Sequence, residues 1–335
     1  MWGAPLLADF ARSGIRYIRM DKPARVDVVG VGLNATDTII SVPQIPGRSG
    51  KVESTAVRIL PGGQVATAMI ACQTWGLRTR YVGKLGDDAA AQVHREACAR
   101  AGVETCLITV PNCASQQSFI LVDRDGERTA VGWREERLTL RPGELKREWI
   151  ANARALLVDG YDTTAATTAA AWARETGIPV VADLDEAYPG IDELLPNVDY
   201  LIVSCGFPEK LCGEADLVVS LPFLQRKFGT RLAAATLGSD GVLARDGEKF
   251  HYAAAFRVRV ADTTGAGDIF HAGFIYGLLQ GWSLQRTLDF SCGAAALNCT
   301  AVGARGGIRT VHEIEALMAD GTRHPAAWNE TPLQR

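Results

Sequence analysis

Short apolar runs alternate along the chain with longer Ala-rich stretches of helical periodicity. The apolar runs are rich in β-branched residues and predict buried strands over 26–33, 155–160, 179–185, 199–204 and 231–238. The stretches between them predict helices over 64–75, 87–101, 163–176, 214–228, 265–280 and 283–301, and several of these end at a glycine. This alternation indicates an α/β fold: a doubly wound, mostly parallel sheet with helices on both faces.

Two stretches interrupt the alternation of strands and helices. Residues 37–60 and 105–133 show strand-like alternation and turns with no helix between them, and they are too polar for central strands. They predict a small antiparallel β flap, which we call the lid, mounted on one domain spanning 25–320. Residues 1–24 are expected to form an N-terminal extension. Exposed strand edges favour association, so we expect a homodimer formed through the lid.

Composition narrows the class of protein. The 335 residues carry a formal net charge of −3, which offers no basic surface for nucleic acid, and no apolar run approaches the ~18 residues of a membrane span. The N-terminus lacks the basic start and cleavage site of a signal peptide. Eight cysteines include no CxxC pair, which favours a reduced, cytoplasmic protein without a structural metal.

Four sequence features follow predicted strands, at the edge where open α/β sheets bind ligands. Asp37 comes just after the first strand, and Gly62 and Gly63 precede the helix that begins near Gln64. The stretch TLGSDG covers 236–241, and VADTTGAGDIF covers 260–270. Their convergence on one edge of the sheet predicts a single binding site there.

The 260–270 stretch has the chemistry of a phosphate site. Gly265, Ala266 and Gly267 open a predicted helix, whose N-terminal N–H groups and positive dipole end bind anions. Asp268 follows immediately and is placed to accept the proton of an attacking hydroxyl. For an isolated GxGD, a helix N-cap or a charge that favours the helix dipole is the preferred reading, so the motif alone does not establish a catalytic base.

The stretch DTTGAGDIFHAGF resembles the C-terminal signature of the PfkB (ribokinase-like) carbohydrate kinase family. The resemblance runs in order from about Arg25 to Ile314 and includes PGGQVATAMIACQTWGL, YVGKLGDDAAAQVHREACARAGV, SFILVDRDGERT and FSCGAAALNCTAVGA. It implies ATP-dependent phosphorylation of the primary hydroxyl of a small sugar, with Mg²⁺ on the ATP phosphates. Asp268 would be the general base, and the turn Gly265, Ala266 and Gly267 would be the anion hole.

The resemblance also implies three groups of binding residues. The sugar site would comprise Asp37, Gly62, Gly63, Gln64 and Thr67. The nucleotide site would comprise Thr236, Gly238, Ser239, Gly241, Ser204 and Cys292. Some relatives hold a monovalent cation such as K⁺, and the matching positions are Asp262, Thr264, Ala301, Gly303 and Gly307.

Several positions depart from the family pattern. Ala35 and Thr67 stand where sugar kinases often carry Asn, and Ser204 and Phe207 replace the Asn and Glu of the NxxE motif linked to Mg²⁺. These changes argue against ribose and resemble the ketohexokinase and sulfofructose-kinase-like branch, so a ketose is the favoured acceptor. An anionic sugar would need an Arg or Lys. Arg134 and Arg137 near the lid are candidates, but a solvated face of the lid is the favoured reading for both.

Alternatives remain beside the sugar kinase. A nucleoside kinase of the same fold would require an aromatic or apolar platform for the base. A sugar-binding relative with weakened catalysis would follow from the loss of the NxxE residues at Ser204 and Phe207. A dinucleotide-dependent oxidoreductase is disfavoured, because no GxGxxG follows the first strand. His271, three residues after Asp268, is expected to pack in the core rather than relay protons.

Overall fold

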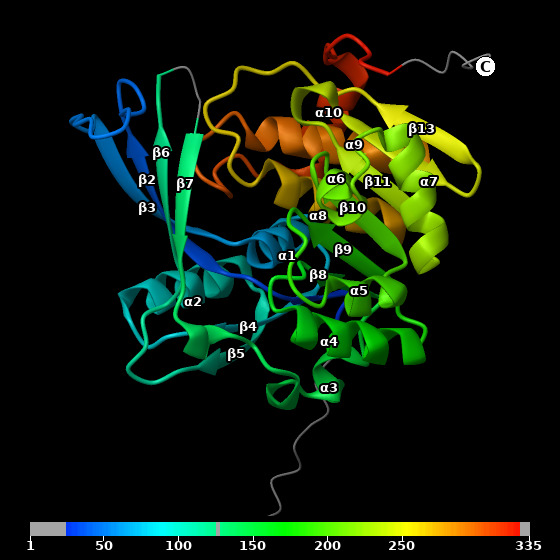
Figure 1. The fold of residues 1–335 in the computed structure, drawn as a ribbon, viewed down its shortest axis with the longest axis horizontal. Helices are drawn as coiled ribbons and strands as arrows, with labels where there is room; N and C mark the ends of the chain where they lie inside the picture. The colour runs from blue at the N-terminus through cyan, green and yellow to red at the C-terminus, as the bar shows by residue number, and fades with distance from the viewer. Residues whose placement is uncertain (1–24, 125–127, 329–335) are drawn as a thin grey trace, which may run out of the picture.

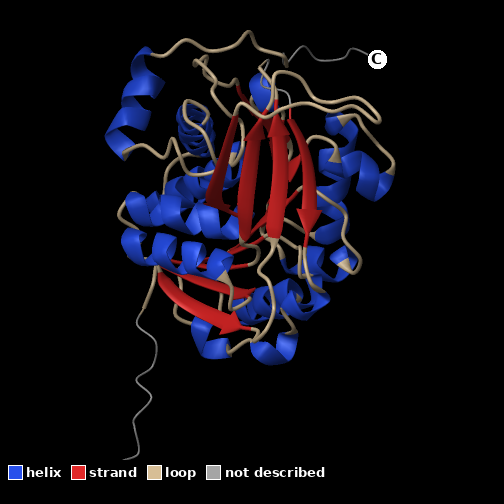
Figure 2. Ribbon diagram, turned by 90° about the vertical axis from the view of Figure 1, so that its left-hand side faces the viewer, coloured by secondary structure: helices blue, strands red, loops and turns tan. Residues whose placement is uncertain are grey.

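The computed structural model describes residues 25–124 and 128–328, so the predicted N-terminal extension over 1–24 lies outside it. A nine-stranded sheet forms the body, with the order β13-β12-β11-β10-β9-β8-β1-β4-β5 (Figures 1 and 2). The strands from β5 to β11 pair in parallel, and β12 and β13 add an antiparallel hairpin at one edge. Their bounds are β1 Val28–Val31, β4 Thr79–Leu85, β5 Glu104–Thr109, β8 Ala155–Val158, β9 Val180–Leu184, β10 Tyr200–Ser204, β11 Leu232–Thr236, β12 Val242–Asp246 and β13 Lys249–Ala253.

Helices cover both faces of this sheet, as the alternation of strands and helices predicts. Successive strand residues point to opposite faces, so Val28 packs in one apolar core with α1, α8 and α9, and Val29 packs in another with α4 and α7. The helices are α1 Gln64–Thr74, α2 Ala89–Ala101, α3 Arg147–Ile150, α4 Thr163–Glu175, α5 Ile191–Leu194, α6 Phe207–Cys212, α7 Leu217–Phe228, α8 Ala266–Gln280, α9 Leu284–Asn298 and α10 Val311–Asp320. None of the helices within the described ranges is long and apolar enough to cross a membrane.

The lid is a separate four-stranded sheet with the order β3-β2-β6-β7, and it rises beside the body in Figure 1. Its strands are β2 Ala35–Ser41, β3 Ala56–Gly62, β6 Gln117–Val122 and β7 Arg128–Trp133. The β2–β3 and β6–β7 pairs are antiparallel, and the two hairpins join through the parallel pair β2–β6. Its outer face exposes large apolar side chains: Val57, Ile59, Phe119, Val131 and Trp133.

Two boundaries differ from those expected from the sequence. Residues 104–109 belong to the body rather than the lid, because β5 pairs with β4 as the last strand of the large sheet. An edge strand is covered less than a central one, so β5 is half-exposed and its sequence is correspondingly polar. The domain also continues beyond 320: Arg323 pairs with Phe256 across a β-bridge, and its Nη1 donates to the carbonyl of Ala254 at 2.6 Å.

Candidate active site

A cavity of about 650 Å³ lies between the lid and the carboxyl ends of the body strands. Its walls come from segments far apart in the sequence: β2 and β6 of the lid, the ends of β8, β9 and β10, and the start of α8. Of the residues singled out from the sequence, the cavity brings together Asp37, Gly63, Gln64, Ser204, Thr236, Gly238, Thr264, Gly265, Ala266, Gly267 and Asp268.

The floor of the cavity is the N-terminus of α8. Gly265 is the N-cap residue, with a φ of 76° in the left-handed region that favours glycine. A side chain at Gly265 would also collide with the backbone of Ala304, so two constraints require glycine there. The first N–H groups of an α-helix have no partner within it, and these lie at the positive end of the dipole. The turn is therefore an anion-binding cradle.

Asp268 lies in the first turn of α8, directly behind this cradle. Burial, together with the nearby Asp183 carboxyl, raises the pKa of Asp268 to about 7, against a usual value of 3.8. The nearby His271 and Arg305 act in the opposite direction. A carboxyl group with a pKa near neutrality, beside an anion cradle, has the properties required of a general base.

Two further carboxyl groups, which were not expected from the sequence, line the same cavity. Asp183 and Asp185 stand at the end of β9, in the run VVADLD, where a strand end was predicted but no role was assigned. Burial, reinforced by Asp185, raises the pKa of Asp183 well above its usual value. Its Oδ2 has no hydrogen-bond partner and lies 3.3 Å from Nδ1 of His271. This part of the cavity is short of positive charge.

A divalent cation bound to phosphate fits this acidic wall. Within residues 25–124 and 128–328, no group of three or more His, Cys, Asp or Glu side chains could hold a metal ion by itself. A Mg²⁺ that arrives with a nucleotide needs only one or two carboxylates, because phosphate oxygens and water fill its other positions. The unpaired Oδ2 of Asp183 and the neighbouring Asp185 meet that requirement.

His271 packs against the backbone, as expected for a core residue. Its Nδ1 lies 2.7 Å from the carbonyl oxygen of Gly267, and its Nε2 lies 3.2 Å from that of Ile202. The ring is buried between α8 and β10. It therefore braces the cradle against the sheet.

Asp37 lines the cavity from β2 of the lid. Its carboxylate packs against Gly62, where any side chain would occupy the position of the carboxylate oxygens. Burial, together with Asp268, raises the pKa of Asp37 to about 7. A nearly buried carboxyl group of this kind is suited to accepting hydrogen bonds from ligand hydroxyls.

Two of the predicted acceptor residues support the cavity from behind instead of lining it. Thr67 is fully buried, and its hydroxyl accepts a hydrogen bond of 3.1 Å from Nε of Arg305. The carbonyl oxygen of Gly62 accepts a 2.6 Å hydrogen bond from Nη2 of Arg305. Arg305 thus links the Gly62–Gly63 turn to α1. The sequence did not predict this role, because the residues that Arg305 contacts lie more than 200 positions earlier in the chain.

An aromatic pair also lines the cavity. The rings of Tyr161 and Tyr188 are 5.0 Å apart, and the guanidinium of Arg134 lies 4.9 Å from the Tyr161 ring. Arg134 makes two hydrogen bonds to the carboxylate of Asp162, at 2.8 and 2.6 Å. Its charge is therefore already matched by Asp162.

The other cationic candidate, Arg137, is also engaged. It pairs with Glu135 at 2.6 Å and lies outside the lining of the cavity. The basic side chain in the lining is Arg128, from β7 of the lid. Position 128 was not predicted, because the sequence does not reveal which face of a lid strand turns inward.

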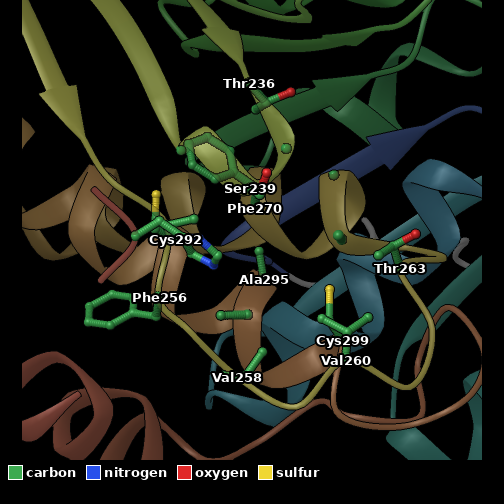
Figure 3. Close-up of a pocket in the computed structure, with 17 residues that line it drawn as sticks. Thr236, Ser239, Phe256, Val258, Val260, Thr263, Phe270, Cys292, Ala295 and Cys299 are labelled. Atoms are coloured by element: carbon green, nitrogen blue, oxygen red, sulfur yellow. The ribbon is translucent and has the colours of Figure 1, made fainter. Parts of the chain in front are cut away.

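A second pocket, of about 240 Å³, opens next to the cradle (Figure 3). Thr236, Gly238, Thr263, Ala266 and Gly267 line both spaces, so the two are continuous. Its walls are mostly apolar and suit a flat ring system. The predicted nucleotide residues Thr236, Gly238, Ser239, Gly241 and Cys292 all line it, whereas Ser204 lies in the larger cavity.

Residues beyond α10 complete this second pocket. His324 lines it, and the backbone N–H of His324 donates to the carbonyl of Ala255 at 2.9 Å. The guanidinium of Arg323 lies 4.0 Å from the ring of Phe256, another wall residue. Cys299 also contributes to the lining.

The residues predicted for a monovalent cation lie in two adjoining loops that are bonded to each other. Asp262 accepts hydrogen bonds from N and Oγ1 of Thr264, at 2.9 and 2.7 Å, and from the N–H of Gly303 at 2.8 Å. Nδ2 of Asn298 donates to the carbonyls of Thr264 and Ala304, at 3.2 and 3.1 Å. Gly307 donates to Oδ1 of the same Asn298, and Ala301 to its backbone carbonyl.

Comparison with known proteins gives a consistent result. A model of the pfkB family carbohydrate kinases matches residues 26–311. The ribokinase of Haemophilus influenzae is 28% identical over 288 residues, covering 83% of this chain and 93% of the relative. The 5-dehydro-2-deoxygluconokinase of Geobacillus thermodenitrificans is 22% identical, covering 76% and 82% of the two chains.

Solved structures agree with this result. A candidate ribokinase from Agrobacterium tumefaciens has a TM-score of 0.81 at 29% identity, covering 88% of this chain and 98% of its own. The adenosine kinase of Sinorhizobium meliloti has a TM-score of 0.76 at 22% identity, with 88% and 100% coverage, which shows a common fold.

Proposed function

The chain belongs to the pfkB family of carbohydrate kinases, and we propose that it uses ATP to phosphorylate a primary hydroxyl of a small sugar, with fructose-like ketoses favoured. One observation carries the proposal. A half-buried carboxyl group at a helix N-terminus, Asp268, shares a cavity with a buried carboxyl group, Asp37, at the end proposed to hold the acceptor. The pocket suited to a nucleotide base opens beside the first of them.

The reaction proceeds by direct phosphoryl transfer. Asp37 accepts hydrogen bonds from sugar hydroxyls and orients the acceptor. Asp268 takes the proton of the primary hydroxyl as its oxygen bonds to the γ-phosphorus, and the bond to the bridging oxygen breaks to release ADP. The N–H groups around Gly265, Ala266 and Gly267 stabilise charge on the transferred group. The proton leaves Asp268 after the phosphorylated sugar has departed.

Asp183 and Asp185 are the residues that we propose for holding Mg²⁺, directly or through water. The cation, when bound, neutralises charge on the ATP phosphates. Phe207, at the position of the family glutamate, is fully buried in the core and cannot reach the cavity. The carboxyl groups at the end of β9 lie in the cavity instead, which supports catalysis over a weakened, merely sugar-binding relative.

A monovalent cation has no step in the proposed reaction. In the loops that would hold K⁺, the carbonyl oxygens of Thr264 and Ala304 accept hydrogen bonds from the Asn298 amide. Asp262 is likewise occupied by three protein donors. The effect of K⁺ on the enzyme would be to stabilise this loop pair.

The ketose preference rests on the acceptor end. Thr67, at a position where an amide would read a hydroxyl, is buried and bonded to Arg305. Ala35, which lines the cavity, offers only a methyl group. With no Asn side chain at position 35 or position 67, the site departs from that expected for ribose.

We also propose a homodimer formed through the lid, in a cytoplasmic protein. The lid's outer face carries apolar side chains that are 41 to 62% exposed, on a sheet whose two edge strands have no further strand partner among residues 25–124 and 128–328. Covering such a surface is a common reason for association. All eight cysteines are free thiols, which favours a reducing compartment.

A nucleoside is the second candidate acceptor. The Tyr161–Tyr188 pair in the cavity is a platform on which a base could stack, as the nucleoside alternative requires. A panel of ketoses, aldoses, deoxy and acidic sugars, and nucleosides, assayed by ADP release with ATP and Mg²⁺, decides between the two. No ATP consumption with any acceptor would point instead to the non-catalytic relative.

Replacing Asp268 tests the proposed chemistry. Asp268→Asn is expected to lower kcat by at least ~10²-fold, the usual loss on removing a general base, with ATP affinity nearly unchanged. The matched control is Asp320→Asn, an exposed carboxylate at the end of α10. Wild-type turnover in Asp268→Asn would remove the role of base from this residue.

A further inference from the structure

Gln116 is a buried amide whose side-chain oxygen has no hydrogen-bond partner among the described residues. It lies just before β6, is only 7% exposed and lines the larger cavity. Its Oε1 is buried with no hydrogen-bond partner. An unpaired buried acceptor costs free energy, so the arrangement is explained if a ligand supplies the donor.

The backbone around Gln116 is held rigidly. Its carbonyl accepts a 2.9 Å hydrogen bond from the N–H of Thr36. The preceding residue, Ser115, donates two hydrogen bonds to the carboxylate of Asp88, from its N–H at 3.0 Å and from its hydroxyl at 2.7 Å. An amide on such a fixed support loses little entropy when it binds, as a recognition group requires.

The pairing of β2 with β6 places Gln116 away from Asp37. Thr36 pairs with Gln117 and Asp37 with Ser118, so Gln116 lies beside Ala35, two residues from Asp37 along the strands. Two residues of a strand span about 6 to 7 Å, the width of a sugar ring. Ala35 carries no polar group, so the Gln116 amide is the side chain at that level able to bind a hydroxyl.

We propose that Gln116 is a specificity-determining residue, whose amide binds a hydroxyl of the acceptor on the far side of its ring from those held by Asp37. The inference rests on the proposed function, since it takes the acceptor to be a polyhydroxylated ring. It predicts that this enzyme distinguishes sugars that differ at one ring position. Gln116 acts on binding and takes no part in the transfer of the phosphoryl group.

The chain supplies its own control at the next residue. Residues along a strand alternate between faces, so Ser118 and Ile120 line the cavity with Gln116, whereas Phe119 is 41% exposed on the outer face. Gln117 shares the outer face with Phe119. Gln117→Met therefore makes the same chemical change on the other side of the same strand.

The experiment combines these variants with deoxy sugars. The best acceptor in the panel and each of its single-deoxy analogues are assayed with wild type, Gln116→Met and Gln117→Met, measuring KM and kcat separately. Gln116→Met should raise KM for the parent sugar about tenfold, the usual effect of one lost hydrogen bond, and change kcat less than about threefold. For one deoxy analogue the wild type and Gln116→Met should have equal KM, and Gln117→Met should follow the wild type throughout.

Each other outcome counts against the inference. If Gln116→Met affects the parent and every analogue alike, or not at all, Gln116 reads no hydroxyl, while sugar phosphorylation by the wild type still stands. If the wild type neither turns over any panel sugar nor binds one in calorimetry, the proposed function fails, and the inference fails with it. Should Gln116→Met not fold, Gln116→Asn, with its amide withdrawn by one methylene, must show the same loss of sensitivity to one hydroxyl.

Discussion

Asp268 must be ionised before it can accept a proton, and its surroundings oppose ionisation. Burial and Asp183 raise its pKa to about 7. The active form of a general base is the deprotonated one, so kcat/KM should fall about tenfold per pH unit below about pH 7 and level off above it. A pH–rate profile of the wild type tests this. A profile that stays flat down to pH 5 would contradict the assignment.

Arg305 shows how a residue outside the cavity can control it. Its guanidinium holds the Gly62 carbonyl and the Thr67 hydroxyl at once, and it is close enough to Asp37 and Asp268 to lower the pKa of both. Arg305→Lys keeps the charge but cannot keep both bonds, because an ammonium lacks the planar fork of a guanidinium.

We therefore expect Arg305→Lys to raise KM for the sugar about tenfold or more, on the scale of one or two hydrogen bonds. Affinity for ATP should change little, since the bonds of Arg305 lie at the acceptor end. Steady-state kinetics with each substrate varied in turn provide the measurement. Arg309→Lys, at an exposed position four residues on, is the control. Equal changes in the KM for ATP and for sugar would indicate general damage.

The residues that the sequence identified are those whose roles are local. The turn around Gly265 and the start of α8 follow from adjacent residues, and so does the position of Asp268. Arg305, Asp183 and Gln116 acquire their roles only through partners brought together by folding, as when Arg305 meets Gly62 across 243 residues. No spacing in the chain signals such a contact.

At the scale of elements, the lid was recognisable but its limits were not. The stretch 37–60 contains most of β2 and β3, the first hairpin of the lid. β5 is similarly polar, because it is the outermost strand of the large sheet. Polarity alone cannot distinguish an edge strand from a lid strand; the pairing partner decides.

The lid's apolar outer face leads to a prediction at this scale. Ile59 is 62% exposed near the middle of β3, so Ile59→Asp places a charge within the proposed dimer contact. We expect the wild type to be a dimer at micromolar concentration and Ile59→Asp to be a monomer, by light scattering. Val219→Asp is the control, since Val219 is 52% exposed but lies on α7. A monomeric wild type would refute the proposed dimer.

At the scale of the whole molecule, a side chain of the candidate site, Asp183, lowers the stability of the fold. Asp183 has a buried, unpaired oxygen and a pKa raised chiefly by burial. The folded state therefore favours the protonated carboxyl of Asp183 over the ionised one. The contribution of Asp183 to the stability of the fold is present at low pH and is lost as the pH rises. Asp183→Asn removes the charge while keeping the shape of the side chain.

Asp183→Asn should accordingly raise the free energy of unfolding of the ligand-free protein by about 1–3 kcal/mol at pH 8, the scale of one buried unpaired polar group. For a chain of this size that corresponds to a few degrees in Tm. Calorimetry at pH 5 and pH 8 should show the larger gain at pH 8, with a lower affinity for MgATP. Asp192→Asn, with a side chain 68% exposed, is the control. A lower Tm in Asp183→Asn would mean that the carboxylate stabilises the fold.

The second pocket is completed by His324, which lines it, and by Arg323, which lies against the wall residue Phe256. Their position in the chain has a consequence for how the protein is made. On the ribosome, the lid and the acceptor wall emerge with the first half of the chain, but these two residues follow every helix and strand described above. Arg305, which holds the Gly62 carbonyl, also emerges late, so a nascent chain completes neither the Gly62–Gly63 turn nor the pocket lined by His324 until synthesis is almost finished. Unfinished chains, in which the second pocket is incomplete, would therefore consume little cellular ATP.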